Sequence, residues 1–286
     1  MNIYDVSRKA GVSIATVSRV LNGSPNVSDR TRNLVLEVMD ELGYTPNVFA
    51  RGLGLGTIQT IGIMCSDSSD PYLPHAIYYL EQGLRGHGYD SILCCTGNSL
   101  ENKQKYFDLL RSKKVDAIIL AGSKFIELKP RDNDYIIEAA KGLPIMLVNG
   151  FLEGDNIYCT LCDDRSATRE ATGRLIASGC RSILYLYTSQ SYSGAGKLQG
   201  YRDALNGCGL PIRDDYIYSC TKDVLAARDL LLNLHASGLI FDAVITSDDT
   251  LAVGAVKYAH ATERSIPDEL SIIGYNNSSY SVCTDP

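Results

Sequence analysis

Apolar residues recur at helical spacing in three short segments within residues 1–45. The first segment spans residues 5–10 and ends at a glycine. The second and third follow Ser13 and Ser28, which belong to a residue type that caps helix N-termini, and span residues 14–22 and 29–42. A glycine also ends the third segment. The pattern predicts three short helices that share a small core.

From residue 57 onwards, short apolar runs alternate with amphipathic helical stretches. This alternation is typical of parallel sheets with helices on both faces, and ligands of such sheets bind beyond the carboxyl ends of the strands. Seven β-α units exceed one small sheet, so we expect two lobes, about 57–159 and 160–286, with a cleft between them. The expected strands are residues 60–65, 91–96, 117–120, 145–148, 183–187, 243–246 and 270–274, and the expected helices are residues 76–87, 103–113, 166–178, 196–206, 224–237 and 251–262.

Residues 46–56, "PNVFARGLGLG", join the two parts of the chain. A glycine-rich phosphate loop follows a strand and opens a helix, whereas this segment follows a helix and precedes a strand. Asn47 can cap a short helix that runs through Leu53, although each interior glycine costs about 1 kcal/mol relative to alanine. We therefore expect a hinge that folds only when something supports it. A permanently flexible linker is the alternative.

The composition is that of a globular protein of 286 residues. No apolar run approaches the roughly 18 residues of a membrane span, and the N-terminus lacks the pattern of a signal peptide. Nine cysteines, an odd number, agree with a reducing compartment, so we expect a cytoplasmic protein. Cys159 and Cys162 have redox or zinc spacing, but no second pair completes a metal site. We expect them to be small apolar residues in or beside a strand, and we expect no metal and no cofactor.

Charge is unevenly placed along the chain. The net charge of −6 argues by itself against nucleic acid as a partner. Residues 1–36, however, carry a net charge of +3, and the acidic excess belongs to the remainder. The basic residues of this stretch are Arg8, Lys9, Arg19, Arg30 and Arg32, against Asp5 and Asp29.

Two helices joined by a tight glycine turn allow the second helix to enter the major groove of DNA. In that arrangement Arg19 can bind a guanine through two parallel hydrogen bonds. Ile14 and Ala15 carry no donors and offer only apolar contact, for instance with thymine methyl groups. The spacing alone also fits an ordinary helical hairpin with solvated arginines.

The first 53 residues resemble the DNA-binding headpiece of the lactose-repressor (LacI/GalR) family almost position for position. "TVSRVLN" and "GYTPN" are specific signatures of that family, and the similarity continues through "GLPIMLVN", "GAGKLQGYRDAL", "SDDTLAVGA" and "IPDELSIIGYNN". The resemblance implies a helix-turn-helix domain (1–45), a hinge (46–56) and a bilobed periplasmic-binding-protein-like domain (57–286) for effector binding and dimerisation. It implies a transcriptional regulator, most simply a repressor, whose homodimer binds a pseudo-palindromic double-stranded operator.

The resemblance also implies which residues contact DNA. Ile14, Ala15 and Arg19 match the specificity positions of the recognition helix, and other positions fix the protein on the duplex, largely through phosphates. In the hinge, the leucine matching Leu53 wedges between base steps in the minor groove. The full set is Tyr4, Ser13, Ile14, Ala15, Thr16, Ser18, Arg19, Asn22, Tyr44, Asn47 and Leu53.

The effector site implied by the resemblance lies in the cleft, where a sugar or sugar derivative would change operator affinity. Many sugar-binding relatives have aspartate at Asn149 and Asn276, arginine at Lys197 and asparagine at Asp248. A phosphorylated or otherwise anionic effector is therefore an alternative. A second alternative is that no small effector binds and a protein partner controls operator affinity. The implied residues are Ser66, Asp70, Tyr72, Asn149, Lys197, Asp249 and Asn276.

Two further expectations follow from the family. Its chains continue past the position of Thr284 with another strand and helix, so we expect either that this chain is a fragment or that its lobes lack these two elements. The dimer surface should be the helix at residues 72–87 and its neighbours.

An enzyme and a solute-binding protein are the rival classes. We find no nucleophile elbow, metal set or phosphate loop, and hence no catalytic residue. The two pairs of adjacent aspartates do not form dyads, because neighbouring side chains point apart. A solute-binding protein would not carry the headpiece. The four histidines, expected at the surface or at helix ends, are His75, His87, His235 and His260.

Overall fold

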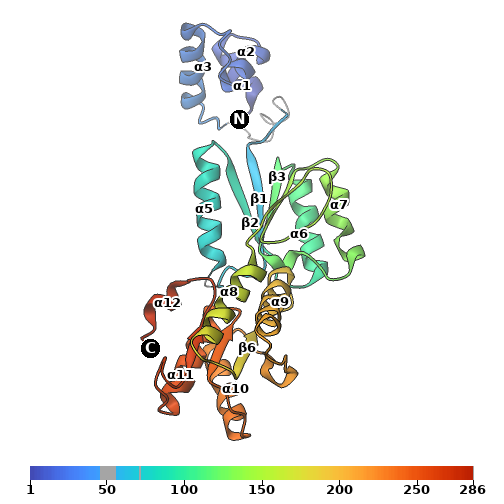
Figure 1. The fold of residues 1–286 in the computed structure, drawn as a ribbon. Helices are drawn as coiled ribbons and strands as arrows, with labels where there is room; N and C mark the ends of the chain where they lie inside the picture. Colours follow the sequence, from blue (N-terminus) through green and yellow to red (C-terminus); the bar gives the residue numbers. More distant parts are fainter. Residues whose placement is uncertain (46–55, 71, 286) are drawn as a thin grey trace.

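The computed structural model describes residues 1–45, 56–70 and 72–285. A small helical headpiece is followed by two α/β lobes, one beyond the other (Figure 1). This arrangement confirms the predicted fold class. The hinge positions Asn47 and Leu53, and the helix expected between them, lie outside the described residues.

Three helices form the headpiece around a core that includes Val6, Val17 and Val35. The predicted caps are present: the hydroxyl oxygens of Ser13 and Ser28 accept hydrogen bonds from backbone N–H groups three residues later. Such caps satisfy donors that a helix N-terminus leaves unpaired. The helices are α1 (Ile3–Ala10), α2 (Ile14–Leu21) and α3 (Asp29–Glu41).

The first lobe is a five-stranded parallel sheet in the order β2-β1-β3-β4-β5. One face packs against α5 through Ile61, Ile63 and Ile119, and the other packs against α6 and α7. The elements are β1 (Thr60–Cys65), α5 (Leu73–Gly86), β2 (Asp90–Cys95), α6 (Leu100–Ser112), β3 (Ala117–Ala121), η1 (Ser123–Phe125), η2 (Pro130–Asn133), α7 (Asp134–Ala140), β4 (Ile145–Val148) and β5 (Ile157–Thr160).

The second lobe is a four-stranded parallel sheet in the order β7-β6-β8-β9. Helices α8 and α9 cover one face, and α10 and α11 cover the other. Gly200 lets α8 and α9 approach, because an added Cβ would lie 2.2 Å from the carbonyl oxygen of Arg165. The elements are α8 (Asp164–Ala177), β6 (Ile183–Tyr187), α9 (Tyr192–Gly207), η3 (Asp214–Tyr216), β7 (Ile217–Ser219), α10 (Val224–Ala236), β8 (Ala243–Thr246), α11 (Asp249–Ala261), β9 (Ser271–Ile273) and α12 (Ser279–Cys283).

The elements that the hydrophobic pattern did not predict include β5, β7 and α7, besides α12 and the 3-10 helices η1, η2 and η3. The two strands are only four and three residues long, and α7 has seven residues. Such short elements carry too few apolar positions to show a period. In addition, α9 begins at Tyr192 rather than at residue 196, because Ser191 caps it four residues earlier than expected.

All nine cysteines are free, and Cys159 lies on β5. In the described part of the chain, no cluster of histidine, cysteine, aspartate and glutamate could hold a metal ion. No helix within those residues combines the length and apolar character needed to cross a bilayer. The four histidines are exposed, which agrees with the sequence-based expectation.

Candidate functional site

A tight turn presents α2 on the outside of the headpiece. Gly11 adopts φ = 65°, a left-handed conformation that glycine enters without strain. The Ser7 hydroxyl donates to the carbonyl oxygen of Val12 at 2.6 Å and fixes the turn. Because Val17 and Val20 point into the core, the opposite face of α2 is open to solvent. That face exposes Ile14, Ala15 and Arg19.

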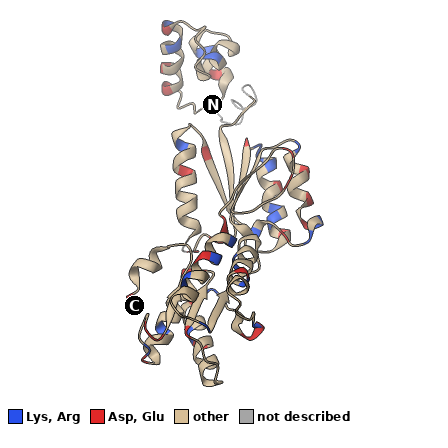
Figure 2. Ribbon diagram, viewed as in Figure 1, with Lys and Arg blue, Asp and Glu red and all other residues tan. Residues whose placement is uncertain are grey.

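Two of the five basic residues in the headpiece are engaged by the headpiece itself. Lys9 pairs with Glu41 at 2.7 Å, and the Arg32 guanidinium donates to the carbonyl oxygen of Ser24 at 2.7 Å. The three arginines Arg8, Arg19 and Arg30 have no ion-pair partner among the described residues. Their charge is therefore available to an external anion. Figure 2 shows Lys and Arg positions in blue on the headpiece helices.

The remaining positions expected to contact DNA differ in solvent exposure and in the hydrogen bonds that they already make. Tyr4 is exposed, whereas Tyr44 packs against the headpiece core. Ser13 and Thr16 are joined through their hydroxyls at 2.9 Å, so both already serve the cap of α2. Ser18 is half-buried, and the buried Oδ1 atom of Asn22 has no hydrogen-bond partner among the described residues.

A cavity of about 210 Å³ lies between the two lobes. Its walls come from loops that follow the carboxyl ends of strands in both sheets, where the β-α pattern predicts ligand binding. The structure brings six of the seven expected effector residues to this cavity: Ser66, Asp70, Tyr72, Asn149, Lys197 and Asn276.

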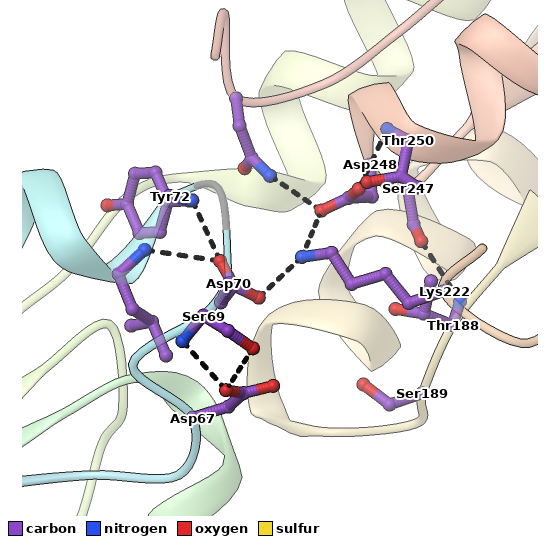
Figure 3. Close-up of polar contacts among 12 residues, drawn as sticks. Asp67, Ser69, Asp70, Tyr72, Thr188, Ser189, Lys222, Ser247, Asp248 and Thr250 are labelled. Carbon is purple, nitrogen blue, oxygen red and sulfur yellow. Dashed lines mark hydrogen bonds and ion pairs between the residues drawn. The ribbon is translucent and has the colours of Figure 1, made fainter. Parts of the chain in front are cut away.

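An ion cluster crosses the cavity from one lobe to the other (Figure 3). The Lys222 ammonium lies 2.5 Å from an Oδ2 of Asp70 in the first lobe and 2.7 Å from an Oδ2 of Asp248 in the second. Burial alone would lower the pKa of Lys222, but the two carboxylates outweigh burial and raise it. Burial alone would raise the pKa of Asp70. The Lys222 ammonium outweighs burial and lowers that pKa.

Both carboxylates of this cluster are also held by helix N-termini. Oδ1 of Asp70 accepts hydrogen bonds from the backbone N–H groups of Tyr72 and Leu73 at the start of α5. Oδ1 of Asp248 accepts from the N–H of Thr250 at the start of α11. Helix N-termini favour negative charge, so the two acids are fixed in position before any ligand arrives.

Two asparagines, one in each lobe, follow strands whose carboxyl ends face the cavity. Asn149 follows β4 with φ = 59°, and Asn276 lies beyond β9 with φ = 97°. Asparagine tolerates this left-handed region better than most residues. The Asn276 amide donates to Oδ2 of Asp248 at 3.0 Å, which ties it to the ion cluster.

Asp249 does not take part in the cavity, so its expected place in the effector site needs correction. Its Oδ2 accepts a hydrogen bond from the backbone N–H of Ser278 at 2.6 Å, and the side chain is buried against the turn after β9. Its neighbour Asp248 lines the cavity instead. Asp248 is the N-cap of α11, and Asp249, the first residue of that helix, is bound to the turn after β9 instead.

Lys197 lies on the wall of the cavity and is only 6% exposed. Its ammonium donates to the carbonyl oxygen of Ser247 at 3.0 Å and sits 3.6 Å from the ring centroid of Tyr275. The Tyr275 hydroxyl in turn donates to Asp164 at 2.6 Å. Burial lowers the pKa of Lys197.

Sequence reasoning missed several residues that line the cavity. Lys222 follows the three-residue strand β7. Had that strand been predicted, Lys222 would have been expected at the cavity, because ligands bind beyond the carboxyl ends of parallel strands. Ser123, on the short helix η1, contacts Ser191 of the other lobe through their hydroxyl oxygens at 2.9 Å. No regular pattern in the sequence marks η1.

Comparison with known proteins identifies the family of the chain. The family profile described as "Periplasmic binding proteins and sugar binding domain of LacI family" matches residues 58–282, and that described as "Bacterial regulatory proteins, lacI family" matches residues 2–47. An HTH-type transcriptional regulator of Lachnoclostridium phytofermentans is 57% identical over 286 residues, covering 100% of this chain and 86% of the relative. Catabolite control protein A of Priestia megaterium is 33% identical over 296 residues, covering 100% and 85%.

Among solved structures, a Lac repressor dimer bound to operator and the anti-inducer ONPF has a TM-score of 0.87 at 22% identity, over 99% of this chain and 84% of that chain. That likeness concerns the fold. The profile matches span most of the chain, and the curated relatives are transcriptional regulators rather than enzymes. The chain therefore belongs to the LacI family of bacterial transcriptional regulators and carries the DNA-binding helix-turn-helix of that family.

Proposed function

We propose that this chain is a sequence-specific repressor whose operator affinity is set by a small effector, a carbohydrate or carbohydrate derivative, in the cavity between the lobes. The observation that carries the proposal is the Lys222 bridge, because it joins acids of both lobes inside a cavity lined by polar side chains. A ligand that enters this cavity must contact both lobes at once. We place its action in the cytoplasm, where the chromosome lies.

In this proposal α2 reads the operator. Arg19 binds a guanine through two hydrogen bonds, which discriminates against other bases by about 1 to 3 kcal/mol. Ile14 and Ala15 make apolar contacts with bases. The exposure of all three side chains on one face of α2 supports these roles. Tyr4, Ser13, Thr16, Ser18, Asn22 and Tyr44 position the headpiece on the phosphate backbone.

The hinge completes the DNA interface. We assign Leu53 to the minor groove, where an inserted apolar side chain unstacks a base step and bends the duplex. Asn47 would cap the hinge helix as it folds on DNA. Part of the binding free energy is then used to order the hinge. A change in the spacing of the two hinges of a dimer would hinder or favour this folding and so alter operator affinity.

The start of the first lobe is built to transmit such a change. The Asp116 carboxylate accepts a hydrogen bond from the Thr57 hydroxyl at 2.7 Å and from the backbone N–H groups of Ile58 and Thr60. The chain that emerges from the hinge is therefore pinned to the lobe. An effector shifts operator affinity only if it binds one arrangement of the lobes better than the other.

A second copy of the chain is the proposed partner on α5. This helix leaves Tyr78 and Tyr79 exposed, and Leu93 of the neighbouring strand β2 is exposed as well. Large exposed apolar side chains of this kind are typical of interfaces. A homodimer would present two headpieces and so read a pseudo-palindromic operator.

Salt dependence and base preference test the DNA-binding roles together. Operator duplexes obtained by site selection are titrated with the full chain by fluorescence anisotropy at several salt concentrations. We expect steep salt dependence, because phosphate contacts release counterions. Arg19→Ala should flatten the preference at one base pair, and Leu53→Ala should weaken specific binding more than non-specific binding. Equal losses on all sequences for both variants would refute these roles.

A further inference from the structure

Two lysines of the described chain are buried, and they differ in how their charge is balanced. Lys103 is 2% exposed, and its ammonium pairs with Oε1 of Glu127 at 2.5 Å. Lys197 is 6% exposed and has no carboxylate within ion-pair distance among the described residues. A buried charge without a counter-charge is costly, and an anionic ligand would supply the missing counter-charge.

The acids that line the cavity do not fill this role, because each is already engaged. Asp70 and Asp248 are held by Lys222, and Asp67 accepts hydrogen bonds from Ser69. Asp164, outside the lining of the cavity, accepts the Tyr275 hydroxyl through Oδ1, and its buried Oδ2 has no hydrogen-bond partner among the described residues. These groups act on Lys197 only at a distance: Asp164, Asp248 and Cys162 raise its pKa, Lys222 lowers it, and burial outweighs them all.

The same wall of the cavity contains the start of a long helix. Helix α9 has 16 residues, and Lys197 lies within its first two turns. Ser193 is 5% exposed and lines the cavity, yet its hydroxyl has no hydrogen-bond partner in the described residues. A hydroxyl without a hydrogen-bond partner, an ammonium without a carboxylate partner and a helix N-terminus all favour the same kind of ligand atom, a negatively charged oxygen.

The facing lobe closes this end of the cavity. Ser123 contacts the α9 cap, Ser191, and Lys124 lines the cavity next to it. An anion held at α9 would therefore meet donors from both lobes. Such an anion would bridge the two lobes, as the Lys222 ion cluster does, but through different side chains.

We propose that the effector of this chain carries an oxyanion, a phosphate or carboxylate group, which binds Lys197, Ser193 and the N-terminus of α9. The proposal rests on the proposed function of the cavity and narrows its ligand to the acidic members of the carbohydrate class, such as sugar phosphates and sugar acids. The hydroxyl and amide groups of the remaining cavity then serve the polyol part.

Calorimetric titration of the full chain tests the proposal with four probes: inorganic phosphate, glucose 6-phosphate, gluconate and glucose. We expect the acidic sugars to bind at least about tenfold tighter than glucose and inorganic phosphate to bind weakly. A stronger response to glucose 6-phosphate or to gluconate identifies phosphate or carboxylate as the natural group. Equal or tighter binding of glucose, or no heat from any anion up to about 10 mM, would overturn the proposal.

Variants separate a role in anion binding from a role in folding. Lys197→Met should abolish the preference for acidic sugars, Lys197→Arg should keep it, and Ser193→Ala should reduce it several-fold. Lys257→Met, an exposed change on α11, is the matched control and should have no effect. Retention of the preference in Lys197→Met, with its thermal transition intact, would contradict the assignment.

The pH profile provides a second readout. Burial lowers the pKa of Lys197. An anion binds the charged form of this lysine better, so at pH values near that pKa the binding of an anion should be coupled to protonation of Lys197. Affinity for the phosphate probe should therefore fall as pH rises through the lowered pKa of Lys197, and it should fall less in Lys197→Arg. A flat profile would contradict the role of Lys197. Operator selectivity, measured on the same samples, reports separately on the proposed function.

Discussion

Replacement of Lys222 by methionine tests whether the ion cluster holds the two lobes together. The substitution keeps an unbranched side chain of similar length but removes the ammonium. Asp70 and Asp248 would then face each other across the cavity without a counter-charge. Their side chains are 16% and 9% exposed, so the protein rather than water would have to absorb the repulsion.

The magnitude follows from burial. Removal of one partner from a fully buried ion pair costs about 3 to 5 kcal/mol. Lys222 keeps 28% of its side chain exposed, and both acids retain hydrogen bonds from helix N-termini, so part of the loss is offset. We expect Lys222→Met to destabilise the folded protein by about 2 to 3 kcal/mol, which lowers the melting temperature by roughly 4 to 10 °C for lobes of this size.

Thermal unfolding of a double-mutant cycle measures the interaction itself. Asp248→Asn alone should destabilise, but in the Lys222→Met background it should recover stability, because it removes the uncompensated charge. We expect a coupling energy of about 1 to 3 kcal/mol. Lys257→Met is the control for loss of a lysine. A Lys222→Met protein as stable as the parent, or strictly additive variants, would refute the reasoning.

Three further predictions concern the rest of the fold. Burial alone would raise the pKa of Asp70, but Lys222 lowers it. The stability that this ion pair contributes is therefore full above about pH 5 and is lost as pH falls through the pKa of Asp70 in the folded protein. The difference in melting temperature between the parent and Lys222→Met should shrink below about pH 4, and a constant difference would contradict this. Gly200→Ala should cost about 2 kcal/mol or more in urea unfolding, because its Cβ would meet backbone 2.2 Å away, whereas Gly207→Ala, with open space, should not destabilise. Lys103→Met should lower stability by about 2 to 4 kcal/mol, because its glutamate partner would be left unpaired, and an unchanged melting curve would exclude that ion pair as a stabilising contact.

The sequence predicted the parts of the fold that depend on local chemistry. Ser13 and Ser28 mark two helix starts because a hydroxyl before an apolar helical period satisfies free N–H groups. Strands of the two sheet centres were predicted well because both faces are covered, which requires continuous apolar runs. The edge strands β5 and β7 were missed because they are short and partly exposed.

The site was harder to predict, because its geometry depends on contacts between distant segments. Lys222 lies 152 positions from Asp70 in the sequence, and no local pattern joins them. The choice between Asp248 and Asp249 depended on which of the two caps α11. Lys197 stood out from the sequence, but its missing counter-charge became visible only in three dimensions.

The most direct test of the central claim is the ratio of affinities of the full chain for its selected duplex and for a scrambled duplex of equal length and composition, at one fixed salt concentration. A regulator that reads its operator through α2 and the hinge should show a ratio of about 10³ or more. A ratio near one, after selection from random sequence, would contradict the account.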